Sequence, residues 1–159
     1  IRESILSLKA GTPQGWSFLP ALKKYLEDFK NNYGIHTELI LENGPLESNF
    51  RPDAEVQILR VIQEAMTNAR KHSNARNLRV SIEREINTGR IKIIDDGCGF
   101  DMDHMNRSGG HYGLAFMKER MMQIGGSIDF HSRPGEGTTI TLIAPVRDQK
   151  EKRNESPAG

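Results

Sequence analysis

The feature that most constrains the fold is a long helical pattern over residues 53–73. Ile58, Ile62, Ala65 and Ala69 recur at spacings of three and four residues, which marks one buried face of an amphipathic helix. The pattern predicts a long helix with one apolar face packed in the core. We expect the rest of the chain to be organised around this helix.

Four polar residues of the same helix share a second face. Glu64 and Asn68 are four residues apart, and Lys71 and His72 follow one turn later. On a regular helix these side chains project together, so they could hold a hydrated divalent cation and phosphate oxygens. A solvated polar face is the alternative, and the helix taken alone leaves it open.

The other elements alternate between helical and strand patterns. Helical spacing occurs at residues 15–33 and resumes at Leu114, ending at the glycine pair 125–126. Strand patterns occur at residues 36–41, 77–85, 90–95, 127–132 and 138–144. This order favours an α+β fold, a two-layer sandwich in which helices cover one face of a mixed, mostly antiparallel sheet.

Length and composition set further limits. The 159 residues are enough for one domain, and the 22 basic and 21 acidic residues nearly cancel, so the charge does not point to nucleic acid. The single cysteine, Cys98, forms no internal disulfide, which fits a reducing cytosolic compartment. The chain begins at Ile1, so we interpret it as a piece of a longer protein.

Three segments follow from this interpretation. Residues 1–14 are expected to be the end of an upstream helix with its linker, and residues 15–146 the folded domain. Residues 147–159 are polar and are expected to be a disordered tail. Inside the domain, residues 100–111 contain two glycines and no regular period, which predicts a mobile functional loop.

A second candidate site lies at the end of a buried strand. Asp95 there could accept a hydrogen bond from an exocyclic amino group, and Gly97 and Gly99 would let the backbone approach a flat ring. An ordinary β-turn is the alternative. Downstream, the residues around Gly113 begin a helix whose N–H groups favour phosphate.

Taken together, the motifs resemble the ATP-binding domain of sensor histidine kinases. Gln-Glu-Ala-x-x-Asn-Ala-x-Lys-His is followed by Asp-x-Gly-x-Gly-Phe, His-Tyr-Gly-Leu-x-x-Met-x-Glu-Arg and Gly-x-Gly-Thr, in that family's order, over residues 56–142. The sequences His-Tyr-Gly-Leu and Lys-Glu-Arg-Met are most similar to those of the nitrate-sensor-like subfamily. The resemblance implies the Bergerat fold of the GHKL group, with ATP and Mg²⁺ as ligands.

The resemblance assigns roles to the polar face of the long helix. Asn68 would be the magnesium ligand, and Glu64 would orient or activate water in the metal shell. Lys71 and His72 would reach phosphate oxygens. A single protein ligand is enough for Mg²⁺, which keeps several waters and binds phosphate oxygens as well.

The resemblance also assigns the base pocket. Asp95 would pair with the adenine amino group, Gly97 and Gly99 would shape the pocket floor, and Thr138 would support the adenine side.

Gly113 and Leu114 would flank the triphosphate, with His111 beside them. His111 replaces the first glycine of the family's commoner Gly-x-Gly-Leu, a substitution that recurs in the nitrate-sensor-like group. The separate phenylalanine box of larger histidine kinases is not apparent.

The resemblance further implies partners. The phosphate acceptor would be a histidine on an upstream dimerisation domain, and the phosphate would pass on to a response regulator. The full-length protein would be a homodimer and a membrane-associated sensor with this domain in the cytoplasm, while the chain alone would be monomeric and would not autophosphorylate. An anti-sigma-type serine kinase or other GHKL ATPase, and a nucleotide-sensing domain without catalysis, are the alternatives.

Overall fold

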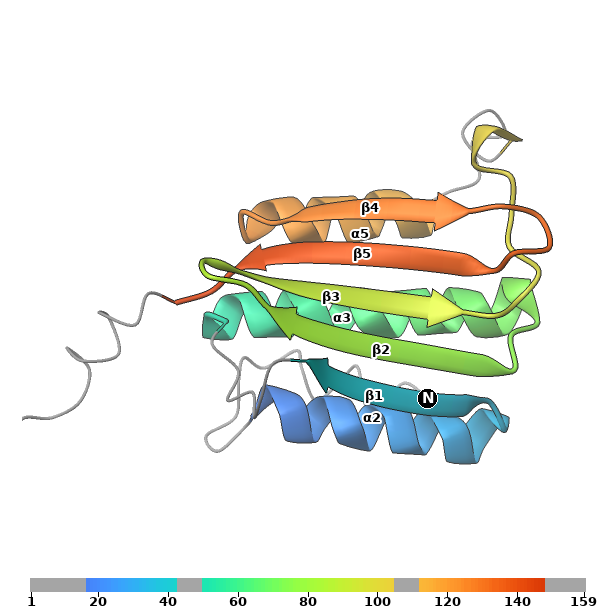
Figure 1. Cartoon of the computed structure of the whole chain (residues 1–159), viewed down its shortest axis with the longest axis horizontal. Coiled ribbons are helices and arrows are strands. Elements are labelled where there is room, and N and C mark those ends of the chain that lie inside the picture. The colour runs from blue at the N-terminus through green and yellow to red at the C-terminus, as the bar shows by residue number, and fades with distance from the viewer. Residues whose placement is uncertain (1–16, 43–49, 105–111, 148–159) are drawn as a thin grey trace, which may run out of the picture.

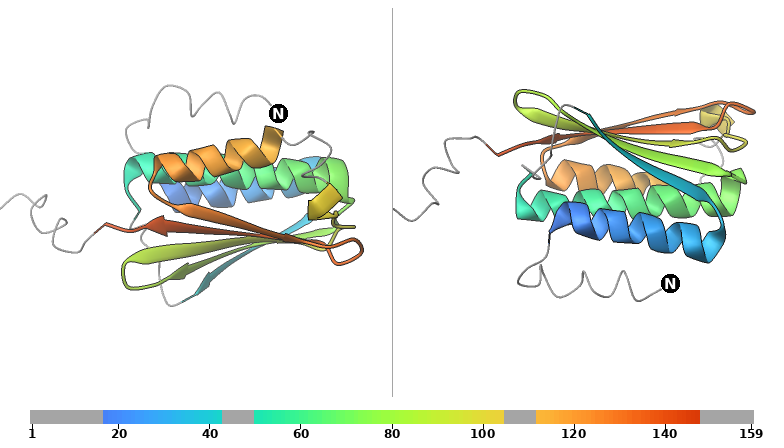
Figure 2. Two further views of the ribbon diagram at one scale, coloured as in Figure 1. Left: turned by 90° about the horizontal axis from the view of Figure 1, so that it is seen from above. Right: turned by 60° about the horizontal axis from the view of Figure 1, so that its bottom comes forward.

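The computed structural model describes residues 17–42, 50–104 and 112–147. They form a two-layer sandwich in which three helices pack on one face of a five-stranded sheet (Figures 1 and 2). In chain order the elements are α2 (Phe18–Tyr33), β1 (His36–Glu42), α3 (Pro52–Asn68), η1 (Ala69–Ser73), β2 (Asn77–Arg84), β3 (Thr88–Asp95), α5 (Tyr112–Gln123), β4 (Ser127–Ser132) and β5 (Thr138–Pro145). The predicted α+β sandwich is confirmed.

The sheet has the strand order β1-β2-β3-β5-β4. Only the β1–β2 pair is parallel, and the other three pairs are antiparallel. Side chains alternate between the two faces, so Leu78, Val80 and Ile82 of β2 are buried under the helices while Arg79 is exposed. The sequence prediction of a mixed, mostly antiparallel sheet is therefore correct.

The core lies between the sheet and the helix layer. Each helix contributes the apolar stripe that its spacing predicts: α2 buries Leu22 and Leu26, α3 buries Ile58 and Ile62, and α5 buries Met117 and Met121. Figure 2 shows the three helices side by side over the sheet, with α3 between α2 and α5. α3 therefore packs against both of the other helices.

The long helix departs from the prediction in its last turn. It is α-helical only as far as Asn68, and the residues of η1 form a π-helix. The Ser73 hydroxyl donates a hydrogen bond to the Ala69 carbonyl at 2.7 Å, and Asn74 then ends the helix in the left-handed conformation with φ 54°. The premise of a regular helix for Lys71 and His72 is therefore wrong, because a π-turn changes the direction of the side chains that follow Asn68.

Several expectations fall outside the described residues. These are the upstream segment 1–14, most of the tail 147–159, residues 105–111 of the expected mobile loop, and His111. Within the described ranges, no helix combines the length and the apolar character that crossing a membrane requires.

Candidate functional site

The predicted site residues that the structure describes lie on elements that meet at one end of the sandwich, at the right in Figure 1. The carboxyl ends of β3 and β4, the start of β5, the end of α3 with η1, and the start of α5 all meet there. Motifs that are far apart in the sequence therefore share one edge between the helix layer and the sheet.

Glu64 and Asn68 lie one helical turn apart on α3, and both are partly buried. Gly113, the second residue of α5, sits directly against them: a Cβ atom added to it would lie 2.8 Å from Glu64 Oε1 and 3.3 Å from Asn68 Nδ2. Glycine thus allows this close approach of α5 to the Glu64 side chain. A carboxylate and an amide at the start of a helix suit both Mg²⁺, which prefers oxygen ligands, and a phosphate, which binds helix N–H groups.

Asp95 ends β3 on the face of the sheet that the helices cover. Burial raises the pKa of its carboxyl group, and hydrogen bonds from neutral groups, chiefly the Gly97 N–H at 2.9 Å to Oδ1, lower it only in part. The neighbouring charge that contributes is that of Asp96, which is also negative and raises the pKa further. A partly buried carboxylate supported by neutral donors is well suited to accept a hydrogen bond from a ligand.

The glycines of the loop after β3 allow two close contacts. Gly97 packs against the backbone and side chain of Ser73, where a Cβ atom would overlap Ser73 O, Oγ and Cβ. Gly99, with φ +62°, lies against the carbonyl groups of Arg133 and Gly137. The loop is therefore packed between η1 and the β4–β5 hairpin, and the role of both glycines in a base pocket stays a prediction.

Backbone hydrogen bonds hold this loop in place. The Cys98 N–H donates to the Ser73 carbonyl at 2.7 Å, and the Gly135 N–H donates to the Cys98 carbonyl at 2.6 Å. The Cys98 thiol is exposed and donates weakly to the His72 carbonyl at 3.5 Å. Cys98 thus connects the end of the long helix to the hairpin through its backbone.

Asp96 has a different role from its neighbour. It is exposed, and its carboxylate accepts hydrogen bonds from the N–H groups of Arg76 and Asn77, both at 2.9 Å, and from the Asn77 side chain at 2.6 Å. The Asn77 side chain and these N–H groups lower the pKa of Asp96. Asp96 therefore fixes the turn between η1 and β2.

Thr138 is buried and lies directly opposite Asp95 in the β3–β5 pairing. Its Oγ1 is 2.8 Å from the hydroxyl of Ser132, which lies opposite it in the β4–β5 pairing. Thr138 therefore lies beside Asp95, and its role next to the base stays a prediction.

Lys71 and His72 are exposed on η1, in contrast to the partly buried Glu64 and Asn68. The His72 backbone touches the Cys98 thiol, so η1 adjoins the loop after β3. Leu114 follows Gly113 and packs at the edge of the core. The structure thus brings Glu64, Asn68 and Gly113 into contact, and it leaves Lys71 and His72 on the outer rim.

A clamp between α2 and η1 supports the rim. The Arg70 guanidinium stacks over the Tyr33 ring, 4.3 Å from its centroid. Next to it, burial raises the pKa of Tyr25 to about 12, and a hydrogen bond with the Thr67 side chain opposes this shift. Cation–π contacts of this kind hold a side chain in place, so α2 restrains the segment that carries Lys71 and His72.

Sequence reasoning missed the supporting residues. Ser73, Ser132, Gly137 and Arg70 contact site residues or their supports, yet each stands outside the roles that the motif resemblance assigned. Of these residues, Gly137 is a fixed position of the Gly-x-Gly-Thr motif, so the motif was a sequence signal for it. In the structure Gly137 lies against the Asp95 carbonyl group.

Comparisons with known proteins bear on the family of this chain. Residues 53–148 match the family model described as histidine kinase-, DNA gyrase B-, and HSP90-like ATPase. The chain is 30% identical to the signal transduction histidine-protein kinase/phosphatase DegS of Brevibacillus brevis over 94% of this chain and 38% of that protein. It is 31% identical to the sensor histidine kinase LiaS of Bacillus subtilis over 98% of this chain and 41% of that protein. The chain thus spans about two fifths of these relatives.

Solved structures share the fold. The ATP binding domain of PrrB from Mycobacterium tuberculosis superposes with a TM-score of 0.66 at 20% identity, over 84% of this chain and 96% of that chain. The histidine kinase domain of the Erythrobacter litoralis EL346 kinase gives a TM-score of 0.64 at 17% identity, over 91% of this chain and 68% of that chain. The family match covers the long helix, the Asp95 loop, Gly113 and Thr138, so the chain belongs to the histidine kinase-, DNA gyrase B-, and HSP90-like ATPase family.

Proposed function

We propose that this chain is the ATP-binding catalytic domain of a two-component sensor histidine kinase and binds ATP with Mg²⁺. The observation that carries the proposal is the contact of Gly113 with Glu64 and Asn68, because it joins the metal-binding face of α3 to the phosphate-binding start of α5. Asp95 lies on the same edge of the sandwich and suits an amino group of the base.

Each residue then has one task. Asn68 holds Mg²⁺, Glu64 orients water in the metal shell, and the start of α5 at Gly113 and Leu114 donates N–H groups to phosphate oxygens. Asp95 accepts the adenine amino group. Mg²⁺ supplies charge neutralisation at the phosphates, which matters because phosphoryl transfer depends mainly on positioning and electrostatics.

Two basic residues and His111 complete the proposed phosphate side of the site. Lys71 and His72 are exposed on η1, so their side chains can extend to phosphate oxygens. His111 stands next to the start of α5 in the sequence, and we assign it to the phosphate side of the site. The motif His-Tyr-Gly-Leu that contains it supports the finer placement in the nitrate-sensor-like subfamily.

Partners follow from the names of the relatives. DegS is described as a histidine kinase and phosphatase and LiaS as a sensor histidine kinase. We infer that the full-length protein phosphorylates a histidine on an upstream dimerisation domain, forms a homodimer and passes the phosphate to a response regulator. Residues 15–146 would then be the catalytic domain on the cytoplasmic side of a membrane-associated sensor.

An anti-sigma-type serine kinase is the second candidate, because it shares the fold. The two relatives named above are histidine kinases, at 30% and 31% identity, which favours the first proposal.

The test is calorimetry with MgATP on Asn68→Ala. We expect the affinity for MgATP to fall at least tenfold with an unchanged melting temperature, because the loss of a polar ligand contact is worth about 1.5 kcal/mol or more. Asn87→Ala, in an exposed hairpin turn, is the matched control. Equal MgATP affinity in the Asn68 variant and the wild type would remove Asn68 from this role, and no ATP binding by the wild type would refute the proposal.

A further inference from the structure

Three polar side chains form one row across the end of the sheet. Asp95 of β3 pairs with Thr138 of β5, and Thr138 pairs with Ser132 of β4. Directly opposite residues in a sheet point to the same face, so a carboxylate and two hydroxyl groups stand side by side under the helix layer. Ser132 and Thr138 are both buried, at 7% exposure each.

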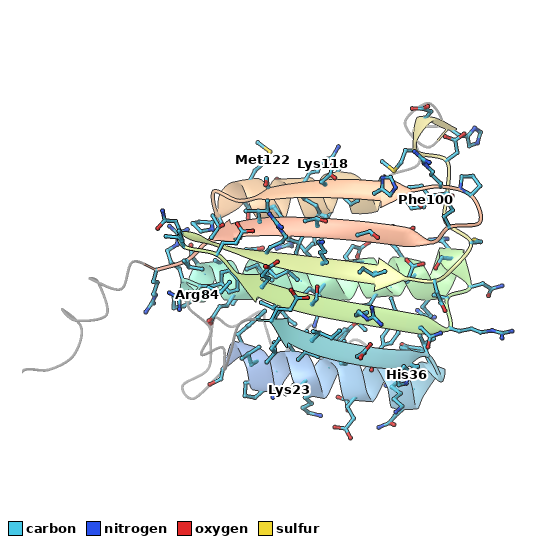
Figure 3. The ribbon with its side chains drawn as sticks, in the orientation of Figure 1. Lys23, His36, Arg84, Phe100, Lys118 and Met122 are labelled. Carbon is cyan, nitrogen blue, oxygen red and sulfur yellow. The ribbon has the colours of Figure 1, made fainter. Side chains whose placement is uncertain are left out.

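The Ser132 hydroxyl has three partners. Its oxygen accepts the Phe100 N–H at 2.9 Å, lies 3.1 Å from the Gly137 carbonyl oxygen, and lies 2.8 Å from Thr138 Oγ1. A serine hydroxyl donates one hydrogen bond and accepts two. Figure 3 labels Phe100 at the end of the sheet where β4 and β5 are joined.

The directions of these hydrogen bonds follow from the partners. The Phe100 N–H can only donate, and the Gly137 carbonyl can only accept, so the single Ser132 proton goes to Gly137. The remaining partner, Thr138, must then donate its own proton to Ser132. With that proton committed, Thr138 Oγ1 offers only lone pairs to anything else that approaches it.

We infer that Ser132 is a specificity-determining positioning residue, which turns the Thr138 hydroxyl into an acceptor and so makes the Asp95–Thr138 pair select a base with an exocyclic amino group. The inference rests on the proposed ATP site. An amino group has two N–H donors and suits two neighbouring acceptors, directly or through a bridging water. A base with a carbonyl at that position meets acceptors only, and its oxygen is left without a donor.

The test compares ATP with ITP, which differ by an amino group and a carbonyl at the same position of the base. The measured quantity is the ratio of the dissociation constant of MgITP to that of MgATP, obtained by calorimetry. In Ser132→Ala the Thr138 hydroxyl is free to donate to the carbonyl, so we expect the ratio to fall about three- to tenfold. Ser132→Thr keeps the hydroxyl and should keep the ratio of the wild type.

Two controls separate base recognition from folding. Ser127→Ala removes an exposed hydroxyl from the same strand and should change neither the ratio nor the melting temperature. Hydrogen exchange of the Phe100 amide should become faster in Ser132→Ala, because the amide loses its acceptor. A more mobile Phe100 would weaken the binding of MgATP and MgITP alike, so it would leave the ratio of their dissociation constants unchanged. If the alanine variant does not fold, Ser132→Cys, with its weak donor and acceptor, should show the same fall in the ratio.

The outcomes are distinguishable. A wild-type chain that prefers ATP and a Ser132→Ala variant that keeps the full preference would overturn the role of Ser132 and leave the proposed function intact. Failure of the wild type and of Ser127→Ala to bind ATP at all would refute the proposed function itself, and with it the basis for this inference. A reduced ratio that Ser132→Thr restores would support both.

Discussion

The contact between α5 and α3 allows a substitution that damages the site without damaging the fold. In Gly113→Ala the new Cβ would lie 2.8 Å from Glu64 Oε1, so the carboxylate would have to retreat by about 0.6 Å to reach the ordinary contact distance of 3.4 Å. The obstructed atom is the end of a flexible side chain, and Gly113 has no left-handed backbone angle that would exclude alanine. The core therefore need not move.

The expected magnitudes differ for stability and for binding. Alanine favours a helix over glycine by up to about 1 kcal/mol, so the melting temperature should stay the same or rise by about 2 to 4 °C. In the proposed site, displacement of Glu64 would remove a charge-assisted hydrogen bond to water in the metal shell, worth about 1.5 to 3 kcal/mol, so MgATP affinity should fall about 10- to 100-fold.

Calorimetry with MgATP and thermal unfolding, both on the same preparation, measure the two effects. Ala115→Gly, which makes the reverse exchange at an exposed position two residues along the same helix, should lower the melting temperature and leave the affinity unchanged. A Gly113→Ala variant that binds MgATP like the wild type would refute the assignment of this contact to the site. A large loss of stability in that variant would show that the contact is structural.

Four further outcomes are expected. Burial raises the pKa of Asp95, so the folded state loses stability as pH rises through the carboxyl range. Asp95→Asn should therefore melt at a higher temperature than the wild type at pH 7, and this difference should close below about pH 3.8. The same variant should bind MgATP weakly. Asp96→Ala should melt at a lower temperature than the wild type at pH 7, and that difference should disappear in acid. Hydrogen bonds, chiefly from the Asn77 side chain, lower the pKa of Asp96, so the stability that its carboxylate contributes is lost as pH falls through that pKa. Arg70→Ala should lower stability by about 0.5 to 1 kcal/mol in denaturant unfolding, through loss of the Tyr33 contact, while Arg84→Ala on β2 serves as the comparison. Incubation with γ-labelled ATP and Mg²⁺ should leave no acid-labile label on the five histidines, and stoichiometric label on any of them would contradict an external acceptor.

Much of the fold could be predicted because its signals are local. The spacing of Ile58 and Ile62 predicts the buried face of α3, and the alternation of Leu78, Val80 and Ile82 predicts the buried face of β2. Glu64 and Asn68 are likewise related by one helical turn, so sequence spacing was enough to place them together.

The parts that escaped prediction depend on contacts between distant segments. A π-turn of five residues leaves no periodic signal, so the outward position of Lys71 and His72 was not foreseeable from helical spacing. Ser132 was missed for a similar reason. Its hydroxyl reaches its partners Thr138 and Gly137 only because the β4–β5 hairpin folds them against it. Gly113 was assigned to phosphate from the motif, whereas its contact with Glu64 required the packing of α5 on α3.

Asp95 and Asp96 show how the sheet divides two adjacent carboxylates between ligand and fold. Asp95 is the last residue of β3 and lies on the face under the helices, whereas Asp96 follows it outside the strand and is exposed. Asp95 takes that place, where burial raises the pKa of its carboxyl group even though the Gly97 N–H donates a hydrogen bond to it. The Asp96 carboxylate accepts hydrogen bonds from the N–H groups of Arg76 and Asn77, which fixes the chain between η1 and β2. The turn that Asp96 stabilises thus holds Asp95 where burial disfavours its charge, which is the environment that the proposed adenine contact needs.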